Sequence, residues 1–425
     1  MPLPWLRPLR PDPGLRLPAG KISAGTSVPF SMFRCSFLFF GALCPLLPAR
    51  DIHVGKDFPS IAQAIRVAQP GDTIHLEPRV YHEYAGFHAR KGEPGRPITL
   101  DGHGATLDGS EPLDPAQWRE MAPDLYVADN LLPSLSDSVL GRWYFLFDGQ
   151  MQRMGRTSKG RKAAFKAPAE LQPGEWTFVR DPAREDPASK RVYGRFFIRL
   201  APGQALAQAG IRLPVRAAGV QLSGDNAHLV IRNLTATHVY NDGFNIHGDC
   251  REVVFENIRA IECGDDGISA HESAQYRVDG LVSIGNSTGI TDIGTAQTSY
   301  RNVFLARNVG YDLYFLDEGR YSVSKALIHS SAQNPLVITG RSGSGCRVVL
   351  EQVHLKRLVE PRLGVVAQNA ILEARHCTFE GLELQVAGTV TWDNCRVNGR
   401  SMPPDQETAT GAGDLSALRP SLEGL

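Results

Sequence analysis

The sequence has no excess of either charge and no apolar segment long enough to span a membrane. Its 45 Lys and Arg residues balance its 45 Asp and Glu residues. An even balance gives no basic surface for nucleic acid and no acidic surface for a cationic partner. The apolar run from Cys35 to Leu47 is shorter than a spanning helix requires. The composition therefore argues against nucleic-acid binding and against integral membrane proteins.

Cysteine is also scarce, and its spacing matches no zinc site. Two of the seven cysteines lie near the N-terminus, and five lie between Cys250 and Cys395. Five is an odd number, and none of them follows a motif that activates a thiol. We expect buried, unpaired thiols. A bridge between Cys250 and Cys263 in an oxidising compartment remains an alternative.

The N-terminal residues divide into two segments that we separate from the fold. Residues 1–31 are rich in Pro, Gly and Arg and have no apolar periodicity, which is typical of an over-extended start or a disordered tail. Residues 32–49 have the length and apolar core of a signal peptide. We predict a secreted or periplasmic protein that begins near Arg50, with no stable membrane span after cleavage. The alternative is a disordered tail ahead of an uncleaved anchor.

Glycine, by contrast, is abundant, with 42 residues, and the stretch from Val239 to Ser273 contains one short unit written twice. Asp242 and Asp266 are 24 positions apart, and His247 and His271 each follow the glycine of their unit by four residues. A repeat of this length indicates a solenoid whose successive coils stack about 4.8 Å apart. Residues at the same offset then become neighbours in space.

The same sequence repeat continues before and after this stretch. One residue at a fixed offset precedes each apolar run, at steps of 24, 23, 22 and 23, namely Asn233, Asn257, Gly280, Asn302 and Lys325. Short alternating strands broken by Gly, Asn and Asp are typical of a right-handed parallel β-helix. We expect the asparagines of this series to form a buried amide ladder.

The organisation predicted for the rest of the chain follows from where this repeat holds. Residues 50–112 contain the first coils and a capping helix, Ile61 to Ala68, with Ser60 as N-cap. Residues 113–214 do not show this repeat and are predicted to form an inserted β-rich subdomain. We assign no role to its aromatic residues. Coils resume at 215–400, and the polar segment 401–425 is predicted to be disordered.

The opening of the solenoid resembles a known family. The phrases AQPGDTIHLEPRVYHE and RPITLDGHGATLDG, after residue 67 and residue 95, are similar to the N-terminus of the pectin-lyase-like β-helix superfamily. The resemblance implies an all-β, right-handed parallel β-helix with an N-terminal capping helix.

Three carboxylates fall at two neighbouring turns of this predicted solenoid. Asp242 precedes one strand, and Asp265 and Asp266 precede the strand of the next coil. Carboxylates held a few Å apart cannot all ionise freely, so one pKa should rise and an acid should lie beside a base. Cleavage of a glycosidic bond needs such a pair. We predict these three residues as catalytic.

Polar residues on the following strands are the candidates for substrate binding. Alternation places Phe244 and Ile246 inward, with polar neighbours on the outer face. The predicted binding residues are Asn245, His247, His271, Glu272 and Arg320. No metal ligand and no cofactor is predicted for a hydrolase, and the expected partner is a polysaccharide or oligosaccharide.

Two short segments resemble polygalacturonase-type glycoside hydrolases. The segment Asn-Asp-Gly-Phe-Asn-Ile from residue 241 is similar to their Asn-x-Asp-x-Phe-Asp-Ile, and Gly-Asp-Asp-Gly from residue 264 to their paired aspartates. The resemblance implies that Asp242, Asp265 and Asp266 are catalytic. Thr288 stands where that group has a histidine, and its Arg-x-Lys pair is represented only by Arg320 and Lys325.

Other functions stay open at this point. A polysaccharide lyase would use Lys or Arg as base, here Arg301, Arg320 or Lys325, and Ca²⁺ held by the aspartates and Glu272. A non-catalytic β-helix could bind glycan without cleaving it. Aspartates are also frequent at β-helix turns because they cap their own backbone. A product assay separates the two enzymes, since a lyase leaves an unsaturated uronate and a hydrolase leaves a new reducing end.

Overall fold

The computed structural model describes residues 48–129, 131–132, 135–159, 162–185, 190–341, 345–367 and 369–403. The segment 1–31, nearly all of the predicted signal peptide 32–49 and most of the tail 401–425 lie outside the described residues. Within these ranges, no helix has the length and apolar character needed to cross a membrane.

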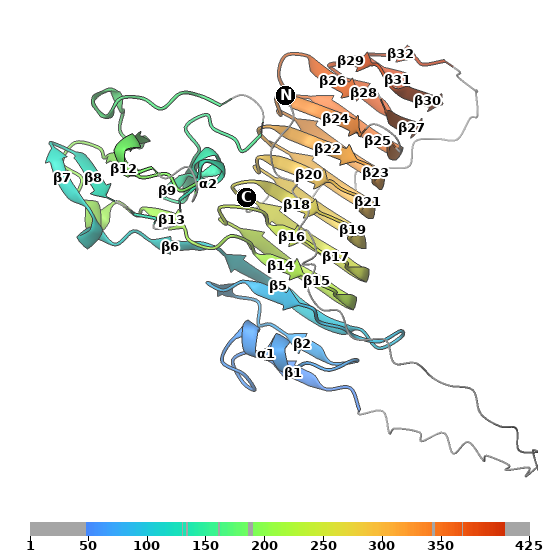
Figure 1. Cartoon of the computed structure of the whole chain (residues 1–425), viewed down its shortest axis with the longest axis horizontal. Coiled ribbons are helices and arrows are strands. Elements are labelled where there is room, and N and C mark those ends of the chain that lie inside the picture. The colour runs from blue at the N-terminus through green and yellow to red at the C-terminus, as the bar shows by residue number, and fades with distance from the viewer. Residues whose placement is uncertain are drawn as a thin grey trace, which may run out of the picture. The chain divides into compact units, whose positions relative to one another are not determined.

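Two parallel sheets wind through the chain as the stacked coils of a β-helix (Figure 1). In the smaller sheet, β16 (Phe244–Ile246) pairs in parallel with β18 (Asp266–Ala270), with Phe244 opposite Ile268 and Asn245 opposite Ser269. The 24-residue step is therefore the register of the fold. The predicted parallel β-helix is confirmed.

The larger sheet contains, among the described residues, β1 (Asp51–His53), β2 (Thr73–His75), β3 (Val80–Tyr81), β5 (Ile98–Asp108), β15 (Ala227–Thr237), β17 (Arg251–Ile261), β19 (Gln275–Ile284), β21 (Gln297–Ala306), β23 (Arg320–Ser330), β25 (Cys346–Arg357), β27 (Ala370–Arg375), β28 (Thr378–Glu380), β30 (Thr389–Asp393), β31 (Arg396–Val397) and β32 (Arg400–Ser401). The smaller sheet contains β4 (Ala85–His88), β14 (Val220–Ser223), β16, β18, β20 (Thr288–Asp292), β22 (Tyr311–Asp317), β24 (Asn334–Gly340), β26 (Arg362–Val366) and β29 (Leu382–Val386).

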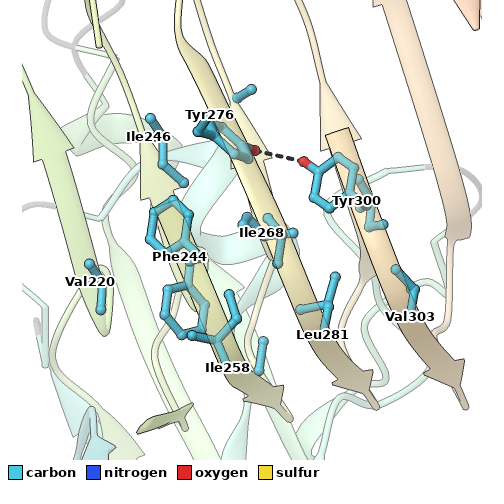
Figure 2. Packing of buried hydrophobic residues seen from close by; sticks show 14 of the residues in the cluster. Val220, Phe244, Ile246, Ile258, Ile268, Tyr276, Leu281, Tyr300 and Val303 are labelled. Atoms are coloured by element: carbon cyan, nitrogen blue, oxygen red, sulfur yellow. Dashed lines mark hydrogen bonds between the residues drawn. The ribbon is translucent and has the colours of Figure 1, made fainter. Parts of the chain in front are cut away.

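The core lies between these two sheets and is built from stacked rows of apolar side chains. Phe244 and Ile246 are fully buried, as the alternation predicted, and Ile268 continues the row in the next coil (Figure 2). Each such side chain is worth about 1.5–3 kcal/mol when taken out of water. Figure 2 also shows Tyr276 and Tyr300, whose hydroxyls lie 2.6 Å apart inside the core.

A bend with left-handed backbone divides each long strand of the larger sheet. Asn233, Asn257 and Asn302 occupy this bend with φ of 55°, 50° and 56°, and Lys325 has φ of 51° at the same place. Asparagine adopts this conformation more readily than most residues. These asparagines are not buried: Asn257 is exposed, and Asn233 and Asn302 are partly exposed. The predicted burial of these amides is wrong, because the repeat marks a backbone bend at the surface; Asn257 does donate to the Asn233 side chain there, at 3.4 Å.

Buried amides do link neighbouring coils at a different position. The Asn286 side-chain oxygen accepts a hydrogen bond from the Cys263 backbone N–H at 2.8 Å. The Asn286 backbone N–H donates in turn to the Asn308 side-chain oxygen at 3.1 Å. Both asparagine side chains are fully buried. They satisfy backbone groups at a corner where no strand pairing is available.

The first coil is covered by α1 (Ile61–Val67). Ser60 caps it, accepting a hydrogen bond from the Gln63 N–H at 3.3 Å, and Ala68 ends it. Ile61, Ala64 and Ile65 are buried against the coils. This helix matches the prediction to within one residue at its C-terminal end.

A β-rich segment interrupts the coils between β5 and β14. It contains two antiparallel sheets, β10–β9–β13–β6 and β11–β12–β8–β7. Trp143 and Trp176 are almost fully buried in its core. Its elements are β6 (Ser110–Pro112), η1 (Pro115–Gln117), β7 (Arg119–Ala122), β8 (Leu125–Asp129), α2 (Asp137–Arg142), β9 (Phe145–Phe147), β10 (Gln150–Gln152), η2 (Pro168–Glu170), β11 (Trp176–Arg180), η3 (Pro182–Arg184), β12 (Gly194–Arg199), η4 (Leu206–Gln208) and β13 (Arg212–Pro214).

A half-buried histidine links two carboxylates where this inserted segment leaves the coils. His238 lies 3.4 Å from Asp108 and 3.5 Å from Glu262. Burial opposes its charge, but the two carboxylates raise the pKa of His238 to about 9. Burial likewise opposes ionisation of Asp108, but His238 and the Ser110 groups lower its pKa to about 2.

We predict that this cluster makes the stability of the protein depend on pH. A raised histidine pKa stabilises the fold fully below about 6.5, the unfolded value, and its contribution disappears as the pH rises through about 9. His238→Asn, which tolerates the left-handed backbone at this position, should cost roughly 2 kcal/mol at pH 6 and much less at pH 9.5. Urea unfolding at both pH values measures this. His88→Asn, at an exposed histidine, is the control, and an equal loss at both pH values would contradict the assignment.

Candidate functional site

Three aspartates meet at the turns that precede β16 and β18. Asp242, Asp265 and Asp266 each place one carboxylate oxygen within 4.8 Å of the others. All three are buried, with exposed fractions of 3%, 8% and 3%. The one-coil step of the solenoid brings Asp242 beside Asp266, because both lie at the same offset of the repeat. Burial at this level is unusual for charged side chains, which then need partners.

Asp242 receives its hydrogen bonds from the neighbouring coil. The Ser269 hydroxyl donates to one oxygen at 2.8 Å, and the Asp266 backbone N–H donates to the other at 3.1 Å. Ser269 is fully buried beneath this carboxylate. Asp242 therefore helps to hold the register of the two coils as well as facing the other carboxylates.

The partners of Asp265 and Asp266 come from the inserted segment. Arg142, at the end of α2, lies 3.1 Å from Asp265, and the Lys159 ammonium lies 3.2 Å from the other oxygen of that carboxylate. Lys159 also contacts Asp266 and donates to the Thr291 hydroxyl at 3.3 Å. The Ser158 hydroxyl bonds to Asp265. Two cations thus lie against three buried carboxylates.

A buried arginine fixes this part of the inserted segment on the coils. Arg153 donates to the Gly264 carbonyl at 2.8 Å, to the Gly285 carbonyl at 3.1 Å and to the Cys263 carbonyl. These carbonyls belong to the turns next to Asp265 and in the following coil. Tyr144 adds a hydrogen bond from its hydroxyl to the Val239 carbonyl at 3.1 Å. The cations are therefore positioned by a rigid attachment.

The charges divide the three carboxylates into two kinds. Burial alone would raise the pKa of Asp265, but Lys159 and Arg142 hold it well below its usual range. Burial, and then the charge on Asp265, raise the pKa of Asp242 to about 6 and that of Asp266 well above its usual range. Ionisation is thus favoured at Asp265 and opposed at Asp242 and Asp266, which is the kind of difference expected for adjacent acidic turns.

Two histidines lie on the same edge of the smaller sheet. The rings of His247 and His271 stack with centroids 4.0 Å apart and planes inclined by 9°. Burial, and then His247, lower the pKa of His271 to about 4, so this ring is neutral at neutral pH. Glu272 lies 3.2 Å from the Nδ1 of His247 and accepts the Gly248 N–H at 2.9 Å.

A cavity of about 350 Å³ opens over these groups. This is near the lower end of the usual volume of ligand pockets. Polar and apolar side chains both line it, namely Arg142, Lys159, Asn241, Asp242, His247, Asp265, Asp266, His271, Thr291, Ile293, Tyr314 and Leu316. The Tyr314 ring stacks on Tyr311 at 4.3 Å. The cavity thus places a planar aromatic group beside carboxylates and hydrogen-bond donors, a combination suited to a sugar.

Three of the predicted substrate-binding residues do not line this cavity. Asn245 is buried and bonds to Gln221 of the preceding coil at 3.1 Å, so it stabilises the stack. Glu272 is exposed and orients His247. Arg320 is exposed at the start of β23 in the other sheet. Asn245, Glu272 and Arg320 therefore lie outside the lining of the cavity, whereas His247 and His271 reach it.

Sequence reasoning missed the groups that matter most for the charge of the site. Arg142, Ser158 and Lys159 precede their carboxylate partner by 123, 107 and 106 residues. A fixed repeat cannot indicate contacts from an insertion of irregular structure. The available signal was the cationic stretch RTSKGRK from Arg156, which lies in an insertion next to an acidic cluster that needs opposite charge.

The third coil supplies hydroxyl groups to this site. Thr288 pairs with Asp266 across the sheet and is buried. Thr291, two strand positions beyond Gly289, reaches the cavity and accepts from Lys159. Thr288 stands where the polygalacturonase pattern has a histidine, so this coil presents neutral hydroxyl groups at that edge of the sheet.

The lyase alternative would need a calcium site at the three carboxylates. Ca²⁺ takes six to eight oxygen ligands. Here the Lys159 ammonium already lies among the oxygens of Asp265 and Asp266, and Arg142 approaches from the other side. Glu272 is engaged with His247. The arrangement does not fit a calcium site.

Comparison with protein-family models and with curated protein sequences gave no match. Among solved structures, the chain is similar to a glycoside hydrolase (11% identity, TM-score 0.42, 79% of this chain and 90% of the other). It is also similar to an alginate lyase from Paenibacillus (10%, 0.39, 81% and 99%) and to a family 28 exopolygalacturonase from Yersinia enterocolitica (13%, 0.30, 81% and 78%). The likeness concerns the fold alone, a parallel β-helix, which the strand register itself establishes.

We predict that Arg153 holds the cationic segment in place. Arg153→Met would leave three carbonyls without their donor, at a cost of about 1–3 kcal/mol each. Residues 153–159 should then exchange their amide hydrogens faster, while β17 and β19 keep their protection. Hydrogen exchange with mass spectrometry measures both. Arg195→Met, at an exposed arginine of the same segment, is the control, and unchanged exchange at 153–159 would show that other contacts hold it.

Proposed function

We propose that the chain is a glycoside hydrolase that cleaves a polysaccharide or oligosaccharide at the cavity over Asp242, Asp265 and Asp266. The observation that carries the proposal is the division of charge among these carboxylates. Asp265 stays ionised because Lys159 and Arg142 contact it, whereas burial and the charge on Asp265 raise the pKa of Asp242 to about 6 and favour the protonated form of Asp266. Hydrolysis of a glycosidic bond requires one carboxyl group in each state.

The roles follow from the protonation states. Asp265 is the carboxylate that activates water or attacks the anomeric carbon, since its negative charge is fixed by two cations. Asp266 is the acid that donates a proton to the leaving oxygen, with Asp242 sharing in the titration of the cluster. Tyr314 and the stacked pair His247 and His271 line the space that a sugar would occupy.

The lyase alternative is less well supported by the same contacts. A lyase needs an unprotonated Lys or Arg beside the substrate. Burial opposes the charge of Lys159, but the three carboxylates raise its pKa above the ordinary value and keep it protonated. Arg301, Arg320 and Lys325 lie on β21 and β23 of the larger sheet, away from the cavity lining. Lys159 therefore acts as a fixed charge in this proposal.

Export belongs to the proposal as well. Its support is the apolar segment 32–49, which has the character of a signal peptide. A secreted or periplasmic hydrolase would meet its saccharide outside the cell. Metal ions are not required by the proposed chemistry, so treatment with a chelator should leave activity unchanged.

The deciding experiment is incubation of the purified protein with a panel of acidic and neutral polysaccharides. We expect new reducing ends from one member of the panel, and at least 10²-fold less product with Asp265→Asn. Asp225→Asn, at an exposed aspartate bonded to Lys91, is the matched control and should keep full activity.

The outcomes of this assay separate the candidate functions. An unsaturated uronate product that needs Ca²⁺ would establish a lyase in place of a hydrolase. Saccharide binding without any product would make the chain a glycan-binding protein. Full activity of Asp265→Asn, with reducing ends still formed, would remove the catalytic site from these residues.

We also predict that Lys159 sets the pH range of activity. Lys159 lowers the pKa of Asp242, Asp265 and Asp266. The acid, Asp266, must be protonated, so activity should fall as the pH rises through its raised pKa, and the base, Asp265, must be ionised, so activity should fall as the pH drops through its lowered pKa. Lys159→Met should move both limbs of the pH–rate profile upward by about one unit or more. Lys166→Met, in an exposed ion pair with Glu175, should move neither.

A further inference from the structure

The core position that follows the bend of each coil changes its chemistry at the C-terminal end of the solenoid. In six successive coils this position is aliphatic and buried, occupied by Leu234, Ile258, Leu281, Val303, Ala326 and Val353. In the last two coils it is occupied by Cys377 and then Cys395, each after a bend residue with φ near 50°, His376 or Asn394. The row of stacked side chains thus ends in two neighbouring thiols.

The register places these two thiols directly above one another. Arg375 pairs with Asp393 on one side of them, and Thr378 pairs with Arg396 on the other. The Cys377 backbone N–H approaches the Cys395 sulfur at 3.3 Å. Paired parallel strands lie about 4.7–4.9 Å apart. That spacing falls within the Cα separation of roughly 4.4–6.8 Å that disulfides span.

Other cysteine pairs do not have this relation. Cys250 has Asn226 of the preceding coil as its neighbour, at 3.9 Å from the sulfur, and the Cys263 backbone N–H donates to the Asn286 side-chain oxygen. The two lie at different offsets of their coils, so the bridge between Cys250 and Cys263 that the sequence left open does not form. All five described cysteines are buried and unpaired, as predicted.

The two thiols lie near the C-terminal end of the described coils. β29 is the edge strand of the smaller sheet, and the last strand of the larger sheet is the two-residue β32. Val386 is 46% exposed and Leu363 is 40% exposed at this end. Among the described residues, up to 403, the terminal coils therefore have neighbours on one face only, and we expect them to open more readily than the middle of the stack.

We propose that Cys377 and Cys395 form a disulfide that staples the last two coils when the protein meets an oxidising thiol–disulfide pair. Cys395 is the attacking group, because the hydrogen bond from Cys377 lowers its thiol pKa to about 7, against the effect of burial. Its thiolate attacks a small-molecule disulfide and releases one thiolate. Cys377 then loses its proton and attacks the Cys395 sulfur, which releases the second thiolate. Two protein thiols are oxidised, and one external disulfide is reduced to two thiols.

The test compares the full chain treated with dithiothreitol or with oxidised glutathione, followed by alkylation under denaturing conditions. Trypsin cuts after Arg375 and Arg396, and no Lys or Arg lies between them, so both cysteines fall in one peptide, 376–396. We expect this peptide unalkylated and lighter by two hydrogen atoms after oxidation, and doubly alkylated after reduction. Amides of β28 and β31 should exchange roughly ten-fold or more slowly in the oxidised protein.

Variants separate this bridge from other oxidation. Cys395→Ser and Cys377→Ser should each lose both the mass change and the slower exchange, while Cys346→Ser, at a buried cysteine outside the pair, keeps both. A peptide 376–396 that stays doubly alkylated after oxidation of the wild-type chain would overturn the proposal. So would slower exchange that persists in Cys395→Ser. None of these measurements depends on the activity of the enzyme.

Discussion

The structure of the site depends on the attraction between two cations of the inserted segment and three buried carboxylates of the coils. Three aspartates this close and this buried would repel one another strongly if nothing compensated their charge. Arg142 and Lys159 supply that compensation from a segment more than a hundred residues earlier in the chain. The same contacts attach the insertion to the solenoid. The contacts that attach the inserted segment to the coils are therefore the same contacts that set the pKa values of the three carboxylates.

The solenoid contributes a fixed spacing to this arrangement. Each coil advances by one strand, so a residue type repeated at the same offset becomes a row, whether of apolar side chains, bends or acids. The row of bends tolerates Asn, Gly, Lys, Gln and His, because its requirement is a left-handed backbone and not an amide. The row of acids has only two coils, since Thr288 follows Asp266 in the next one. The acidic cluster is thus confined to one place on a long uniform stack.

The sequence was sufficient for the parts of the structure that repeat. The step from Asp242 to Asp266, the inward rows and the capping helix followed from periodicity and capping alone. Predictions failed where burial depended on something outside the repeat. Asn245 was expected outside, but it is buried and bonds to Gln221 of the preceding coil. The partners of Asp265 could not be predicted, because an irregular insertion has no spacing from which to infer its contacts.

The buried carboxylates are not explained by the ordinary chemistry of β-helix turns. An aspartate that only caps a turn lies in water and accepts from its own backbone. Asp242 does accept a hydrogen bond from the Asp266 backbone N–H, and it therefore also has a structural role. Asp265 and Asp266 instead face Arg142, Ser158 and Lys159, inside a cavity. Buried ion pairs rarely stabilise a fold more than apolar residues of similar size would. A cluster that costs stability, holds two protonation states and borders an open cavity is better explained by catalysis than by folding.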